Sequence, residues 1–127
     1  MTDPALKSLA GIQILVVEDH DDSRDFLQQV LTHAGASVKA AASAREASLA
    51  LDDADLVITD YAMPGDTGLW LLERVRERPR PVPVIVLTGY ADLHSQQLAK
   101  APFASVLRKP VDPWHLCEIA WAVLRGT

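Results

Sequence analysis

Five polar side chains with complementary chemistry each follow a short apolar run of the sequence. Three are carboxylates, one is a hydroxyl and one is an ammonium: Glu18, Asp19, Asp60, Thr88 and Lys109. Apolar runs rich in β-branched residues are typical of strands buried on both faces of a parallel sheet. The carboxyl ends of such strands share one edge of the sheet, where ligands bind. We therefore expect these five side chains to meet in one site.

The carboxylates of this group predict a metal site, and the other side chains predict a bound phosphate. Clustered carboxylates repel one another unless a cation neutralises them. Mg²⁺ suits such oxygen ligands and keeps several of its own waters. An aspartate such as Asp60 can accept a phosphoryl group covalently. Lys109 and Thr88 can bind the oxygens of that phosphate through a positive charge and a hydroxyl hydrogen bond.

The elements that must position these residues alternate between strands and helices. We expect strands at residues 12–17, 37–41, 56–59, 84–87 and 104–107, and helices near residues 26–33, 43–51, 69–75, 92–100 and 113–124. Ser43 and Glu46 have capping-box spacing, Asp112 precedes Pro113 as an N-cap, and Gly35 can end the first helix. This alternation predicts an α/β fold with a parallel sheet and helices on both faces.

The bulk properties narrow the class of protein. A chain of 127 residues has the length of one domain, and its net charge of −5 provides no general field that would attract nucleic acid. Cys117 is the sole cysteine, which excludes an internal disulfide and a multi-cysteine zinc site. Residues 1–7 contain no apolar run of signal-peptide length. We therefore expect a cytoplasmic protein with no membrane or direct nucleic-acid partner.

Four strand-end stretches occur in the order and at the spacing of a known family. They are Ile14-Leu15-Val16-Val17-Glu18-Asp19, Ile58-Thr59-Asp60-Tyr61-Ala62-Met63-Pro64-Gly65, Val86-Leu87-Thr88-Gly89-Tyr90 and Leu107-Arg108-Lys109-Pro110. In these stretches the chain resembles the receiver domains of bacterial two-component response regulators, and the resemblance covers about residues 11–125. We expect an N-terminal extension at residues 1–10 and a receiver domain at residues 11–127.

The resemblance implies a fold and a function. The fold is a flavodoxin-like, doubly wound (βα)5 three-layer sandwich with strand order 2-1-3-4-5, an order for which a chemotaxis member of the family is a standard example. Asp60 is implied to take a phosphoryl group from a histidine kinase or a histidine phosphotransfer protein and to signal to a downstream protein target. A cis peptide bond between Lys109 and Pro110 is implied to aim Lys109 into the pocket.

The resemblance also implies how the chain holds its Mg²⁺ cofactor. Asp19, Asp60 and the backbone carbonyl of Ala62 are the implied ligands, and Glu18 acts through metal-bound water. The chain departs from many receivers at Val106, where an aromatic side chain often couples to the threonine hydroxyl. Ala62 and Tyr90 flank the implied phosphate, and we expect them to set the lifetime of the acyl phosphate.

Parts of the sequence also fit other functions. A strand-terminal aspartate also occurs in haloacid-dehalogenase-type phosphatases, but that family has a second aspartate where this chain has Ala62. No Gly-rich phosphate loop or nucleophile elbow is present, so we expect no turnover of an external substrate. A receiver-like module that only binds partners would have lost the acceptor, the lysine or the threonine. Both a stand-alone regulator and a receiver excised from a hybrid histidine kinase fit the sequence.

The remaining reactive side chains have plainer interpretations. His20 lies nearest the acidic cluster and could tune it, whereas the other histidines show no metal-ligand spacing. The arginines at positions 74, 76, 78 and 80 are typical of a solvated helix end rather than of a nucleic-acid site. Cys117 is expected to pack in the core.

Overall fold

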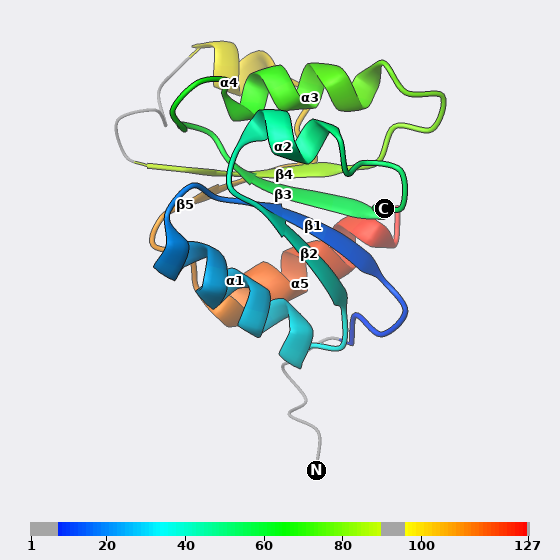
Figure 1. The fold of residues 1–127 in the computed structure, drawn as a ribbon. Helices are drawn as coiled ribbons and strands as arrows, with labels where there is room; N and C mark the ends of the chain where they lie inside the picture. Colours follow the sequence, from blue (N-terminus) through cyan, green and yellow to red (C-terminus); the bar gives the residue numbers. More distant parts are fainter. Residues whose placement is uncertain (1–7, 90–95, 127) are drawn as a thin grey trace.

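A parallel β-sheet lies between two layers of helices in the computed structural model, which describes residues 8–89 and 96–126 (Figure 1). The strands are β1 (Gln13–Val17), β2 (Ser37–Ala41), β3 (Leu56–Asp60), β4 (Val84–Thr88) and β5 (Ser105–Arg108). The helices are α1 (Asp21–His33), α2 (Ala44–Ser48), α3 (Gly68–Arg76), α4 (Gln96–Lys100) and α5 (Pro113–Leu124). None of the described helices is both long and apolar enough to cross a membrane.

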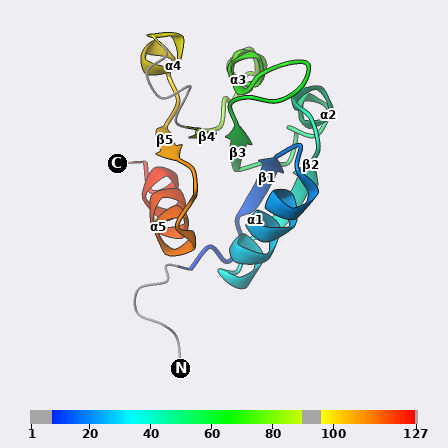
Figure 2. The ribbon, with the colours of Figure 1, turned by 90° about the vertical axis from the view of Figure 1, so that its left-hand side faces the viewer.

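The strand order is β2-β1-β3-β4-β5, and every neighbouring pair is parallel. Helices α1 and α5 cover one face of the sheet, and α2, α3 and α4 lie on the other, as the view along the sheet shows (Figure 2). This arrangement confirms the predicted α/β three-layer fold with order 2-1-3-4-5. All five strands therefore present their carboxyl ends at the same edge.

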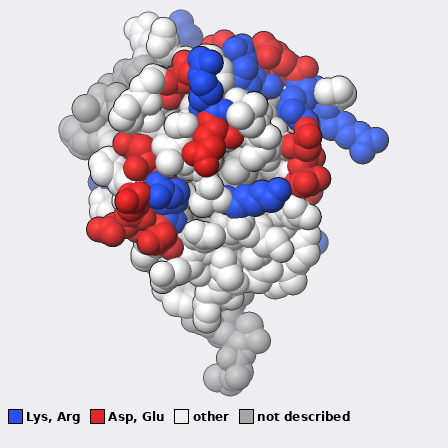
Figure 3. All heavy atoms as spheres, viewed as in Figure 1, with Lys and Arg blue, Asp and Glu red and all other residues white. Residues whose placement is uncertain are grey.

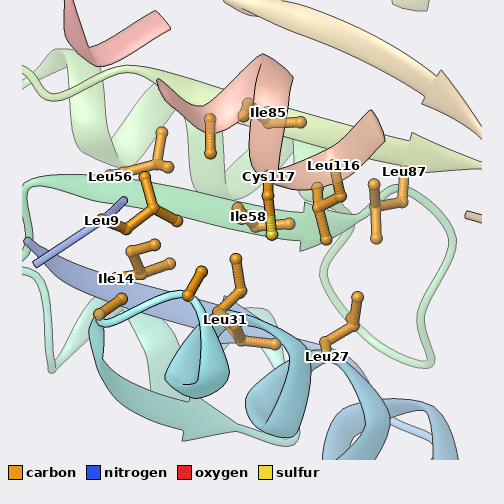
Figure 4. Packing of buried hydrophobic residues seen from close by; sticks show 14 of the residues in the cluster. Leu9, Ile14, Leu27, Leu31, Leu56, Ile58, Ile85, Leu87, Leu116 and Cys117 are labelled. Carbon is orange, nitrogen blue, oxygen red and sulfur yellow. The ribbon is translucent and has the colours of Figure 1, made fainter. Parts of the chain in front are cut away.

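Two apolar clusters hold the layers together, one on each face. The cluster shown in Figure 4 packs α1 and α5 against the sheet through side chains such as Leu31, Ile58 and Leu116. The second cluster packs α2 and α3 on the opposite face. Strands β3 and β4 are buried along their whole length, as their continuous apolar runs predict. Cys117 is fully buried in the first cluster, in agreement with the expected packing role.

Leu9 is also part of the cluster between the sheet and helices α1 and α5. Its side chain is 1% exposed, although it lies in the segment that we expect to be an N-terminal extension. The backbone N–H of Leu9 donates to the carbonyl of Ala34, 2.8 Å away. Residues 8–10 are thus tied to the end of α1, while the boundary at residue 10 stays a prediction.

Most helix ends follow the predicted signals. Asp112 caps α5 by accepting from the backbone N–H of Trp114 at 2.8 Å, and Ser43 caps α2 by accepting from that of Glu46 at 3.1 Å. Gly35 follows α1 with a φ of 107°, the left-handed conformation that glycine allows.

Several predicted boundaries were wrong. Helix α1 begins at Asp21 rather than near Phe26; its first turn was missed because it is polar and shows none of the apolar periodicity. Helix α2 ends at Ser48 rather than near Leu51, because the amides of Leu49 and Ala50 bond only three residues back and tighten the last turn. The last strand runs from Ser105 to Arg108, one residue later than predicted. Residues 92–95 of the predicted fourth helix lie outside the described residues.

Candidate functional site

The five predicted side chains come from the carboxyl ends of four strands. Glu18 and Asp19 follow β1, and Asp60 ends β3. Thr88 ends β4, and Lys109 directly follows β5. Because β3, β4 and β5 are consecutive neighbours in the sheet, Lys109 must reach across the end of β4 to meet Asp60.

An ion pair between Lys109 and Asp60 forms the centre of the site. Lys109 Nζ lies 2.8 Å from Asp60 Oδ1 and 3.4 Å from Glu18 Oε2. Asp60 is 4% exposed and Glu18 is 1% exposed. A single ammonium is therefore shared between two buried carboxylates, which leaves net negative charge in the site.

Burial changes the acid–base properties of this pair. The pKa of Asp60 is raised to about 6: desolvation is the main cause, the hydrogen bond from Lys109 opposes the rise, and the charge of Glu18 adds to it. Burial opposes the charged form of Lys109, but Asp60 and Glu18 outweigh that effect and raise its pKa. At neutral pH Asp60 is thus mainly a carboxylate held in a partly desolvated environment.

The loop between β1 and α1 is held by side chains of α1 and of the loop itself. His20 donates its backbone N–H to Glu18 Oε1 at 3.2 Å, and His20 Nδ1 lies 3.1 Å from the same oxygen. Arg24 Nη1 donates to the backbone carbonyl of Glu18 at 2.9 Å. The contact of Arg24 was missed in the sequence, because the predicted first helix begins near residue 26, whereas α1 begins at Asp21 and carries Arg24 in its first turn.

The acidic group has the chemistry of a divalent metal site. Donor atoms of Glu18, Asp19 and His20 all lie within 4.8 Å of one another. Asp19 Oδ1 is buried and has no hydrogen-bond partner among the described residues. An unpartnered buried carboxylate oxygen is costly, and a bound cation would satisfy it. The residues present therefore fit the Mg²⁺ that the sequence predicts.

The remaining predicted site residues surround this centre. Thr88 is fully buried, and its hydroxyl donates to the carbonyl of Gly89 at 3.2 Å. Ala62 is exposed in the loop after Asp60, and Val106 on β5 is 41% exposed. The Lys109–Pro110 peptide bond is cis. Tyr90 lies outside the described residues.

Gly68 brings the start of α3 against the backbone of the central aspartate. Its N–H donates to the carbonyl of Tyr61 at 2.9 Å. A Cβ atom at position 68 would lie only 2.6 Å from the carbonyl oxygen of Asp60, closer than non-bonded atoms approach. The sequence shows no sign of this contact, since the predicted third helix begins near residue 69. The close approach shows that a side chain there would displace Asp60 or α3.

Two of the arginines near α3 are neutralised by neighbouring acids. Arg74 Nη2 lies 2.9 Å from Glu77 Oε2, and Arg78 pairs with Asp52. Figure 3 shows acidic and basic side chains side by side on this face rather than a patch of one sign. This mixture supports the interpretation of these arginines as a solvated helix end.

The fold and the strand-end site define the class of protein, and comparison with known proteins identifies the family. The profile of the response regulator receiver domain matches residues 14–120. The chain therefore belongs to the receiver domain family of two-component response regulators.

Individual relatives agree with this assignment. The chain is 40% identical to an uncharacterised 14.6 kDa protein of Leptolyngbya boryana, with 90% of this chain and 91% of that protein covered. It is 33% identical to the response regulator protein PilR of Pseudomonas aeruginosa over 87% of this chain, but it spans only 26% of PilR. A receiver domain structure from Clostridium thermocellum superposes with a TM-score of 0.84 at 29% identity, covering 91% of this chain and 95% of that one.

Proposed function

We propose that Asp60 accepts a phosphoryl group from a phosphohistidine donor and that this modification switches the domain between two states. The observation that carries the proposal is the position of Asp60, a 4% exposed carboxylate at a strand end with Lys109 Nζ 2.8 Å away. With a pKa of about 6, most of the Asp60 carboxyl is ionised at neutral pH and available as a nucleophile. The donor is a histidine kinase or a histidine phosphotransfer protein.

Asp19, Asp60 and the carbonyl of Ala62 would hold Mg²⁺, with Glu18 acting through a water molecule. When bound, this ion supplies positive charge that offsets charge on the transferring phosphoryl oxygens. Asp19 Oδ1 accepts no hydrogen bond from the described residues, which supports the assignment of Asp19 as a ligand. Glu18 is already engaged by Lys109 and His20, which supports an indirect role.

In the transfer step, a carboxylate oxygen of Asp60 forms a bond to phosphorus as the phosphorus–nitrogen bond of the donor breaks. The electron pair of that bond stays on the donor imidazole. Lys109 exchanges its contact with the Asp60 oxygen for a contact with a phosphate oxygen. The Thr88 hydroxyl, which now donates to the Gly89 carbonyl, can turn to donate to another phosphate oxygen.

The switch then follows from the change of charge at Asp60. Phosphorylation removes the Lys109–Asp60 ion pair and shifts an existing equilibrium between inactive and active conformations. A downstream protein would bind the active conformation. Val106 is half exposed and aliphatic, so the signal leaves the site through the Thr88 and Lys109 contacts rather than through an aromatic side chain at that position.

Mass spectrometry of the intact protein tests this proposal. Incubation with acetyl phosphate and Mg²⁺ is expected to add about 80 Da to the wild type and to Asp66→Asn, but not to Asp60→Asn. Asp66 is a suitable control because it lies six residues on and pairs with Arg45 at 3.0 Å, outside the central ion pair. An equal mass gain in Asp60→Asn, or no gain in the wild type, would contradict the proposal.

A further inference from the structure

His20 places an imidazole nitrogen beside both carboxylates of the β1–α1 loop. Its Nδ1 lies 3.1 Å from Glu18 Oε1 and 3.5 Å from Asp19 Oδ1. The histidine side chain is 73% exposed, whereas those of Glu18 and Asp19 are 1% and 21% exposed. The imidazole therefore lies on the solvent side of the acidic group.

These separations match those of donor atoms that share one metal ion. Nitrogen and oxygen ligands bind transition metals at about 2.0–2.2 Å, which places neighbouring donors roughly 3.0–3.6 Å apart at tetrahedral or octahedral angles. Both distances from His20 Nδ1 fall in that range. A hydrogen bond alone would explain the Glu18 distance, but the longer Asp19 distance leaves Asp19 Oδ1 without a hydrogen-bond partner among the described residues.

The negative charge of the site is not fully neutralised beside His20. Lys109 occupies the inner side, where it contacts Asp60 Oδ1 and Glu18 Oε2. Glu18 Oε1 and Asp19 Oδ1 face His20 instead of Lys109. A cation bound there would neutralise the oxygens that Lys109 does not contact.

We propose that His20 is an additional metal ligand that gives the acidic pocket a preference for Co²⁺, Ni²⁺ and Zn²⁺ over Mg²⁺. Imidazole nitrogen binds these ions well, whereas Mg²⁺ strongly prefers oxygen ligands and retains its waters. His20 thus adds affinity for the transition metals alone. The inference rests on the proposed function in one respect, since both metals use Asp19 and would compete for it.

Calorimetric titration of the whole chain with Co²⁺ and, separately, with Mg²⁺ tests this proposal. The variants are His20→Gln and the control His33→Gln, which removes an exposed histidine from the far end of α1. Loss of His20 should weaken Co²⁺ binding at least about tenfold and leave Mg²⁺ binding unchanged, given that even the partners of metal ligands contribute about 10- to 100-fold. The visible spectrum of bound Co²⁺ should also change in His20→Gln, while His33→Gln matches the wild type.

The outcomes separate this proposal from the proposed function. Equal Co²⁺ affinity in the wild type and in His20→Gln would overturn the role of His20 as a ligand, even if Mg²⁺ binds normally. Equal weakening of Co²⁺ and Mg²⁺ would also overturn it, since that result indicates that His20 only positions the loop. Failure of the wild type to bind Mg²⁺, with Co²⁺ binding still dependent on His20, would count against the proposed Mg²⁺ site alone.

Discussion

Lys109 and Asp60 form an ion pair of 2.8 Å across the end of the strand that separates them in the sheet. Lys109 follows β5 and Asp60 ends β3, so the pair connects two strands that share no hydrogen bonds. Any group that takes the place of this contact also changes how β5 is held relative to β3. The pair is thus placed to transmit a chemical change at Asp60 to β5, at the edge of the sheet.

Replacing Lys109 tests how much this ammonium contributes to phosphoryl transfer. Lys109→Met should slow phosphorylation by acetyl phosphate about 100-fold, because preorganised charges aimed at a developing anion contribute on that scale. The initial rate of mass gain at saturating Mg²⁺ measures this effect. Lys39→Met is the control. Lys39 lies on β2, at the opposite edge of the sheet from β5, where it is 64% exposed and pairs with Asp53. A rate in Lys109→Met within twofold of the wild type would show that Lys109 has no such role.

The raised pKa of Asp60 predicts a pH-dependent stability. Between its ordinary value of 3.8 and about 6, the folded chain binds more protons than the unfolded chain, so the free energy of unfolding falls as the pH rises. Without metal, Asp60→Asn should therefore be more stable than the wild type by about 1–3 kcal/mol at pH 8.

Urea unfolding in the presence of EDTA at pH 4 and pH 8 measures this difference. The advantage of Asp60→Asn should disappear near pH 4, where the wild-type carboxyl is itself protonated in the folded state. A destabilised Asp60→Asn at pH 8 would mean that the Lys109 contact outweighs the desolvation of Asp60.

Gly68 is predicted to be intolerant of any side chain. Alanine normally favours a helix over glycine by about 1 kcal/mol, but here its Cβ would lie 2.6 Å from the Asp60 carbonyl oxygen. Gly68→Ala should therefore lower the free energy of unfolding by about 1–3 kcal/mol. Gly89→Ala serves as the control, since a Cβ there would have no close contact with the described residues other than its chain neighbours. Thermal unfolding of both variants measures this effect. A Tm for Gly68→Ala at or above the wild-type value would show that the added Cβ does not clash with the Asp60 carbonyl.

We predict that Thr88 transmits the conformational change and is not required for phosphorylation of Asp60. Thr88→Val keeps the buried shape but removes the hydroxyl that donates to Gly89. We expect Thr88→Val to gain the phosphoryl mass but to lose the phosphorylation-dependent change in amide hydrogen exchange of β4 and β5. Thr88→Ser should retain that change. The same exchange response in Thr88→Val as in the wild type would exclude this role.

Much of the fold could be predicted because buried parallel strands are continuous apolar runs. Strand β3 covers its predicted apolar run and continues one residue further, to Asp60. Strand β4 likewise continues one residue past its run, to Thr88. Helix ends were harder: Leu49 and Ala50 favour a helix by composition, yet their backbone closes into a tighter turn. Local propensity does not determine where tertiary packing stops supporting a helix.

The candidate site could be predicted in part, for a related reason. The residues that end strands were predictable, because parallel strands must bring their carboxyl ends to one edge. The contacts of His20 and Arg24 could not be predicted, since they depend on how the loop after β1 turns back on Glu18. The close approach of Gly68 to Asp60 depends in the same way on the path of the loop before α3.

Direct mapping of the modified residue tests the central claim. The wild type is treated with acetyl phosphate and Mg²⁺ and then with sodium borohydride, which reduces an aspartyl phosphate to homoserine. Tandem mass spectrometry of the digested protein locates the new residue. We expect homoserine at position 60 and at no other aspartate. Homoserine at Asp19 or Asp66 instead, or its complete absence, would contradict the claim that Asp60 is the phosphoryl acceptor.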